Sequence, residues 1–236
     1  DYSRTYMVVA DVARGDGKDH SAFHIIDVEN NVQVAEYKGQ LGTKEYGHLL
    51  VGIATEYNEA LLVIENNSIG WSTIQTVIDR GYNNLYYSPK SGEVRADSYF
   101  DQYMDTSKMV PGFTMSSRTR PMVVSKFQEY LSDKGVTLQS KRLLEEMRTF
   151  IWRNGRPEAQ QGYNDDLVMS FGIAMYMRDT AFKFKQHGVD LTKTMLNNIA
   201  SSNTNYIGAY TPAKNKNPYK IDNPYSGGEE DISCLL

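Results

Sequence analysis

Apolar residues near the N-terminus form short continuous runs rather than helical patterns. The run YMVVADVA (residues 6–13) leads into the turn sequence Arg-Gly-Asp-Gly, which is typical of a buried strand that ends in a loop. Two further runs, at 21–29 and 32–39, are separated by Asn30-Asn31, a pair that tolerates positive φ in a two-residue hairpin. These segments predict three consecutive antiparallel strands.

The next segment, residues 43–58, changes to a helical pattern. Its apolar positions recur at helical spacing: Tyr46, Leu49, Leu50, Ile53 and Tyr57. The following run, ALLVIENN (60–67), is again continuously apolar. A strand, a helix and a strand in this order predict a right-handed crossover, which places the new strand parallel to the first. Glu65 is then expected to lie near Asp11.

The middle and late segments predict further helices with fewer strands between them. Helices are expected over residues 69–81, over 119–135 and after Asn164. A strand is expected at 84–90, and residues 91–118 are polar and turn-rich, as in a long loop or hairpin. The segment 140–152 is expected to begin as a helix and to end extended.

The chain changes character near its C-terminus. At 236 residues it is long enough for one large domain, and no internal repeat is found. From about Gly188 the sequence is polar, contains proline and has little periodicity. We expect one domain over residues 1–185 and a C-terminal extension or tail, 186–236, that packs on it.

Composition argues against a membrane protein and against a fold held by internal disulfides. The apolar fraction is 40% and the charged fraction is 23%, and no stretch approaches the roughly 20 apolar residues that span a bilayer. A membrane protein is therefore not expected. The one cysteine, Cys234, cannot form a disulfide within the chain.

Positive charge is concentrated in one segment, although the net charge of the chain is −4. Residues 108–156 contain ten basic and four acidic residues, a local charge of +6. Solvated helix faces would explain such a segment, and so would a surface that binds DNA phosphates. For the second interpretation, the candidate DNA-binding residues are Lys108, Arg118, Arg120, Lys126, Lys141, Arg142, Arg148, Arg153 and Arg156.

Acidic residues at the ends of predicted elements raise the question of a metal site. Asp11 ends the first strand, Glu65 ends the fourth, and Asp165-Asp166 begin the late helix. Hard divalent ions such as Mg²⁺ prefer carboxylate oxygens, and a pair of such ions can catalyse phosphodiester hydrolysis. Asp19 is a further candidate ligand. Each acid also has a structural explanation: Asp11 could cap a turn, Glu65 could pair with an arginine, and the aspartate pair could be a helix N-cap.

Adjacent helical residues point about 100° apart, so one of Asp165 and Asp166 should dominate. Asp165 lies at the rim of the apolar stripe that begins at Leu167, which favours it as the primary ligand. A lone His20 or His48 could shuttle protons, although a surface or core role is commoner for such residues.

Three motifs, in order, resemble the nuclease domain of the large terminase subunit of tailed bacteriophages, particularly the T-even type. They are ADVARGDGKDHSAF, LLVIENNSIGW and YNDDLVMSFGIA. The resemblance covers residues 1–185. It implies an α/β, ribonuclease H-like fold: a mixed sheet of three antiparallel strands followed by parallel strands, flanked by helices.

The resemblance also implies a function and site residues. Such a domain is a metal-dependent endonuclease that cuts double-stranded viral DNA during genome packaging in the host cell cytoplasm. It implies catalytic and metal-binding roles for Asp11, Glu65 and the Asp165-Asp166 pair, with Asp19 a further metal ligand. Two ions, Mg²⁺ or alternatively Mn²⁺, are expected. The implied partners are an ATPase domain in the full-length chain, a portal protein and a small terminase subunit.

Two alternatives remain open at this point. A junction resolvase or transposase-like nuclease would use the same fold and carboxylates. A non-catalytic docking module for packaging partners would have purely structural acids. The sequence contains no GxxxxGK[ST] phosphate-binding loop, so this chain alone is not expected to hydrolyse ATP for packaging.

Overall fold

The computed structural model describes residues 1–15, 19–67, 69–89, 109–153, 155–179 and 181, and the strands 220–222 and 229–231. The chain divides into two compact units, Asp1–Gln186 and His187–Leu236. In the second unit, β9 (Lys220–Asp222) pairs antiparallel with β10 (Glu229–Asp231). Packing of a C-terminal extension on the domain stays a prediction. Lys108, Cys234 and most of the expected loop 91–118 lie outside the described residues.

A four-stranded sheet forms the centre of the first unit. Its strands are β1 (Tyr6–Asp11), β2 (Ser21–Asp27), β3 (Val32–Gly39) and β4 (Leu61–Ile64). Their order across the sheet is β3-β2-β1-β4, with β1, β2 and β3 antiparallel and β4 parallel to β1. The antiparallel pairing of β2 with β3 and the parallel crossover to β4 are therefore confirmed. The predicted two-residue turn is wrong: Asp27 pairs with Val32, so the loop comprises residues 28–31, and of the two asparagines Asn31 has the positive φ.

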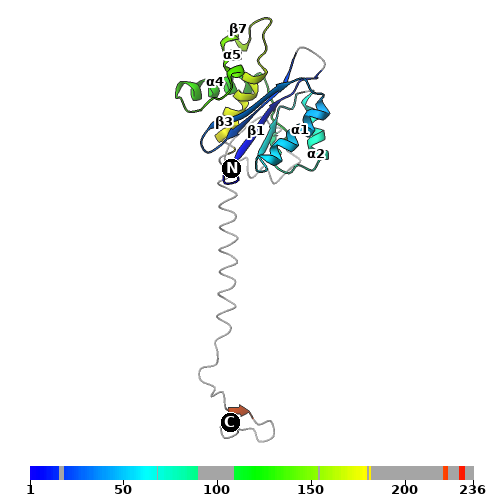
Figure 1. Ribbon diagram of the computed structural model, residues 1–236, viewed down its shortest axis with the longest axis vertical. Coiled ribbons are helices and arrows are strands. Elements are labelled where there is room, and N and C mark those ends of the chain that lie inside the picture. The colour runs from blue at the N-terminus through cyan, green and yellow to red at the C-terminus, as the bar shows by residue number, and fades with distance from the viewer. Residues whose placement is uncertain are drawn as a thin grey trace. The chain divides into compact units, whose positions relative to one another are not determined.

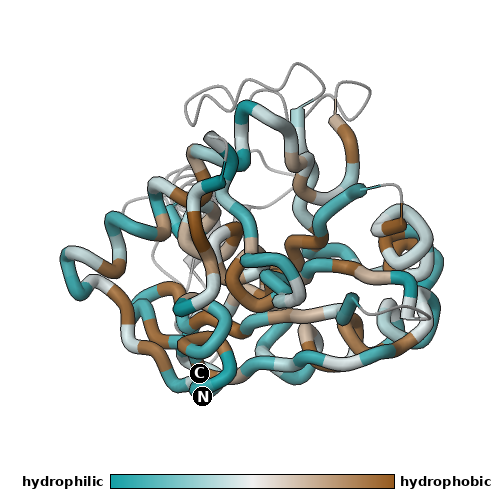
Figure 2. Tube along the Cα trace, turned by 90° about the horizontal axis from the view of Figure 1, so that it is seen from above, coloured by the Kyte–Doolittle hydropathy of each residue, from teal (hydrophilic) through white to brown (hydrophobic). Residues whose placement is uncertain are grey.

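Helices cover both faces of this sheet, as Figure 1 shows. Helices α1 (Thr43–Glu56) and α2 (Gly70–Asp79) pack on one face, against Val8 and Ala10 of β1. The late helix, residues 166–179, packs on the other face against Met7 and Val9. Helix α4 (Thr119–Ser132) covers the late helix. Hydrophobic and hydrophilic stretches alternate along the chain (Figure 2).

The alternation of β1 side chains between two apolar layers explains its continuous apolar sequence. The mixed α/β fold predicted from the sequence is thus confirmed. Within the described residues, no helix has the length and apolar character needed to cross a membrane.

Two small antiparallel pairs complete the first unit. Strands β5 (Tyr87–Pro89) and β6 (Met109–Pro111) pair beside β4. Helix α5 (Lys141–Thr149) passes directly into β7 (Phe150–Arg153), as predicted. Strand β7 forms a hairpin with β8 (Arg156–Ala159), a strand that the sequence did not predict.

Candidate active site

Asp11 and Glu65 bring two carboxyl groups together at one end of the central sheet. The register pairs Ala10 of β1 with Ile64 of β4, and the amide of Glu65 donates a hydrogen bond to the Ala10 carbonyl over 3.0 Å. The side-chain carboxyl groups of Asp11 and Glu65 lie close enough for each to act directly on the pKa of the other. The predicted proximity of these two residues is therefore observed.

Close backbone packing holds Glu65 in place. Helix α2 begins at Gly70, where an added Cβ would overlap the carbonyl oxygen of Glu65. Only glycine allows the helix to approach this closely. Strand β4 and the start of α2 thus fix the position of the acid between them.

The electrostatic environment of the pair disfavours two negative charges. Burial raises the pKa of Asp11 well above its ordinary value, and the negative charges of Glu65, Asp166 and Asp165 add to this effect. Burial also raises the pKa of Glu65, because it outweighs the opposing effects of Asp11, Asn67 and Arg120. A bound cation would relieve this repulsion.

The other two acids lie at the start of the late helix and contact different cations. Asp165 precedes the helix, and its carboxylate lies 2.6 Å from the guanidinium of Arg120. Asp166 is the first helical residue, and its carboxylate lies 3.2 Å from the ammonium of Lys38. Asn164 also donates a hydrogen bond to Asp166 over 3.2 Å.

A cavity of about 580 Å³ connects most of the predicted ligands. Asp11, Asp19, His20, Asp165 and Asp166 all line it. Asp19 is exposed at this cavity, and the Nδ1 atom of His20 lies 3.4 Å from the side-chain nitrogen of Asn164. His48 does not line this cavity.

The donor set fits a hard divalent cation better than a soft one. Four carboxylates converge around the cavity, and oxygen ligands are those preferred by Mg²⁺ and Mn²⁺. Within the ranges that the structure describes, no three acidic, histidine or cysteine side chains lie close enough together to hold one ion as they stand. Because Arg120 and Lys38 hold the two later carboxylates, an ion would have to draw these acids away from their cations.

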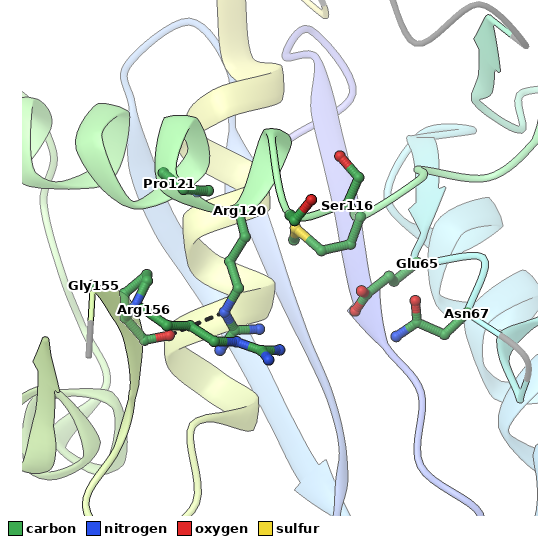
Figure 3. Close-up of a pocket in the computed structure, with 10 residues that line it drawn as sticks. Glu65, Asn67, Ser116, Arg120, Pro121, Gly155 and Arg156 are labelled. Atoms are coloured by element: carbon green, nitrogen blue, oxygen red, sulfur yellow. Dashed lines mark hydrogen bonds between the residues drawn. The ribbon is translucent and has the colours of Figure 1, made fainter. Parts of the chain in front are cut away.

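A second cleft, of about 440 Å³, is lined by Glu65 of the acidic pair. Glu65 and Asn67 approach it from one side, and Arg120 and Arg156 reach into it from the other (Figure 3). Arg120 is held by a 3.0 Å hydrogen bond from its Nε to the carbonyl of Pro157 in β8. Two guanidinium groups beside an acidic pair suit an anionic substrate that also brings phosphate oxygens to a cation.

The predicted DNA-binding residues divide into several groups. Arg120 and Arg156 line the cleft, and Arg118 is exposed at the start of α4. Lys126 pairs with Glu129 and Asp179. Asp179 lies thirteen residues after Asp166 on the late helix, or about 20 Å along its axis, so Lys126 lies far from the aspartate pair.

The remaining basic residues lie on α5 and the β7–β8 hairpin. Arg142 pairs with Glu36 of β3 over 2.8 Å. Lys141 and Arg148 are exposed on α5, and Arg153 is exposed on β7. Whether these residues bind DNA stays a prediction.

Two residues of the site were missed by the sequence analysis. Lys38 contacts both Asp166 and Glu146. Burial lowers the pKa of Lys38, but the two carboxylates raise it by more, so the net shift is upward. Lys38 and Glu146 are 108 positions apart in the sequence. No local pattern indicates such a pair, because in the sequence each residue resembles an ordinary charged residue on a solvent-exposed surface.

Comparison with known proteins identifies the fold. The sequence matches no protein-family model. The large terminase nuclease from thermophilic phage G20c with bound magnesium aligns with a TM-score of 0.55 and 16% identity, over 73% of this chain and 81% of that one. The same nuclease with bound zinc aligns with a TM-score of 0.51 and 19% identity, over 74% and 81%.

A second phage protein gives a similar alignment. The Thermus phage P74-26 large terminase nuclease domain has a TM-score of 0.50 and 17% identity, over 75% of this chain and 81% of that one. At these identities the alignments concern the fold. This chain has the ribonuclease H-like fold of large terminase nuclease domains.

Proposed function

We propose that this chain is a metal-dependent endonuclease that cuts double-stranded DNA with little sequence preference during viral genome packaging. The observation that carries the proposal is the contact between the carboxyl groups of Asp11 and Glu65, beside a cavity that Asp165 and Asp166 also line. The shared fold with large terminase nuclease domains supports it. The host cell cytoplasm is the proposed location.

Asp11, Glu65, Asp165 and Asp166 would hold two Mg²⁺ ions, with Mn²⁺ as a substitute and Asp19 as a further ligand at the edge of the cavity. When bound, such ions activate a water molecule and stabilise the leaving oxygen of a phosphodiester. Asp11 and Glu65 must both lose their protons to act as ligands. Because burial raises the pKa of each, the positive charge of the ions has to supply the favourable interactions that the metal-free site lacks.

Arg120 and Arg156 are proposed to hold the DNA backbone in the cleft beside Glu65. Guanidinium groups bind phosphate through paired hydrogen bonds, and contacts to phosphate carry no base information. This arrangement suits a nuclease that cuts at arbitrary positions. An ATPase domain, a portal protein and a small terminase subunit are the proposed partners in packaging, on the basis of the family resemblance.

Cleavage of two DNA shapes tests the proposal. Linear duplex and a four-way junction of the same sequence are incubated with the protein and Mg²⁺, Mn²⁺ or EDTA. We expect metal-dependent cleavage of both, without a preference for the branch point. Cleavage confined to the junction would indicate a resolvase. If neither DNA is cut, and if metal ions also do not change the melting temperature of the protein, the chain is a docking module.

A further inference from the structure

Asp165, the residue just before the late helix, does not cap the helix with its side chain. The carbonyl of Asp165 accepts the first helical hydrogen bond, from the amide of Met169 over 2.8 Å, so Asp165 occupies the N-cap position. An N-cap aspartate ordinarily accepts hydrogen bonds from the amides two and three residues later. Those amides belong to Leu167 and Val168, and here they bond elsewhere.

Glu146 of α5 takes the place of the missing cap. Its Oε2 atom accepts hydrogen bonds from the amides of Leu167, over 2.9 Å, and Val168, over 3.3 Å. A carboxylate is favoured at this position by the partial positive charge of the helix N-terminus. The side chain of Asp165 is therefore left to contact Arg120 beside the acidic pair.

The other oxygen of Glu146 reaches the second aspartate through a lysine. Its Oε1 atom accepts a hydrogen bond from Lys38 of β3, and the same ammonium group lies 3.2 Å from Asp166. The Lys38 and Glu146 side chains are only 16% and 12% exposed, so water screens this pair weakly. One carboxylate thus influences both members of the aspartate pair.

A buried chain of hydrogen bonds connects α5 and the late helix to the sheet. His24 of β2 bonds through Nε2 to the carbonyl of Leu167 over 3.0 Å, and Gln33 of β3 bonds to its Nδ1 over 2.8 Å. The Gln33 side-chain oxygen accepts from the amide of Ser140 over 2.9 Å, and Ser140 caps α5. Together with Glu146, these bonds form a closed ring.

We propose that Glu146 is a positioning residue of the metal site, because it caps the late helix in place of Asp165 and orients Asp166 through Lys38. The inference rests on the proposed metal-dependent function. Without Glu146, the Asp165 carboxylate would turn to the free amides of Leu167 and Val168, as an ordinary N-cap does. It would then leave the site, where ligands have to be held within about 0.5 Å of their working positions.

Metal-induced stabilisation tests this role without requiring cleavage. The melting temperature of the full chain is followed while Mg²⁺ is added, for the wild type, Glu146→Ala and the matched control Glu145→Ala. Glu145 is the exposed neighbour of Glu146 on α5. We expect Glu146→Ala to need about tenfold more Mg²⁺ for half of the full shift. Glu145→Ala should titrate like the wild type.

A purely structural role would lower the melting temperature without metal but leave the Mg²⁺ midpoint unchanged, and that result would overturn the inference. If Glu146→Ala does not fold, the same Mg²⁺ titration is made with Glu146→Gln. The glutamine keeps one oxygen that can accept from the helix amides, but it has no negative charge to pair with Lys38. Its midpoint should rise by a smaller factor, and an unchanged midpoint would again overturn the inference. A wild type without any metal-dependent shift would contradict the proposed function, and this inference with it.

Discussion

The guanidinium of Arg120 lies 2.6 Å from the carboxylate of Asp165, while the same side chain lines the cleft beside Glu65. Arg120 is therefore shared between an acid of the candidate metal site and the proposed path of the DNA backbone. A DNA phosphate that draws Arg120 away would leave Asp165 available to a metal ion. By linkage, DNA and metal should then each increase the affinity of the site for the other.

Substitution of Arg120 should therefore affect metal binding as well as DNA binding. We expect Arg120→Gln to bind Mg²⁺ more tightly than the wild type in the absence of DNA, because no cation competes for Asp165. The exposed Arg118, two residues earlier, is the matched control: Arg118→Gln should leave the Mg²⁺ titration unchanged. Thermal-shift titrations of the three proteins measure this difference, and identical midpoints would refute it.

Both arginine substitutions should weaken DNA binding for all sequences alike. Contacts to phosphate carry no base information, and each lost contact should reduce the salt dependence of log Kd by about 1. Binding is measured by fluorescence anisotropy between low and moderate salt, in an Asp11→Asn background that prevents cleavage. Affinity that does not change with salt would exclude this surface as the DNA-binding site.

The two adjacent aspartates should differ in their importance. Asp165 raises the pKa of both Asp11 and Glu65, and Arg120 holds it beside the pair. Asp166 raises the pKa of Asp11 more strongly than Asp165 does, but its carboxylate is paired with Lys38. We expect cleavage at saturating Mg²⁺ to be reduced more by Asp165→Asn than by Asp166→Asn, by about tenfold. The reverse order would make Asp166 the primary ligand.

Buried His24 should make the protein less stable in mild acid. Burial lowers the pKa of His24 to about 4, so the folded protein keeps this side chain neutral, while the unfolded chain binds a proton near pH 6.5. The stabilisation that comes from keeping His24 neutral is fully present above pH 6.5 and is lost progressively as the pH falls toward 4. Linkage sets the maximum loss at about 3 kcal/mol.

Urea unfolding of the wild type and His24→Gln at pH 7 and pH 4.5 isolates this effect from the titration of the carboxylates. The free energy of unfolding of the wild type should fall by about 2 kcal/mol more than that of the variant. Equal losses in the two proteins would show that His24 is not the group responsible.

The central sheet and the contact of Asp11 with Glu65 could be predicted because local patterns determine them. Continuous apolar runs indicate buried strands, and a single helix between two of them implies the parallel pairing that aligns their ends. The β8 strand could not be found in this way, since its sequence RPEA contains a proline and no apolar alternation. It is recognisable only from its pairing with β7.

The side-chain contacts around the aspartate pair could not be predicted either. The motif Asn-Asp-Asp is compatible with an ordinary N-cap, and only the tertiary structure shows Glu146 at the amides of Leu167 and Val168. Likewise, the local charge pattern does not separate Lys126, which pairs with Glu129 and Asp179, from Arg120, which lines the cleft. The periodicity of apolar residues predicts which face of a helix is buried, but not which residues that face contacts.

Plasmid cleavage by the wild type and Asp11→Asn, with Mg²⁺ or with EDTA, tests most directly whether the Asp11–Glu65 pair is a metal-dependent nuclease site. The amide keeps the shape of the carboxylate but loses the charge that would bind a cation. We predict that the wild type cuts only with Mg²⁺ and that Asp11→Asn does not cut, although its metal-free melting temperature equals or exceeds that of the wild type. Cutting by folded Asp11→Asn at the wild-type rate, or cutting by the wild type in EDTA, would contradict this account.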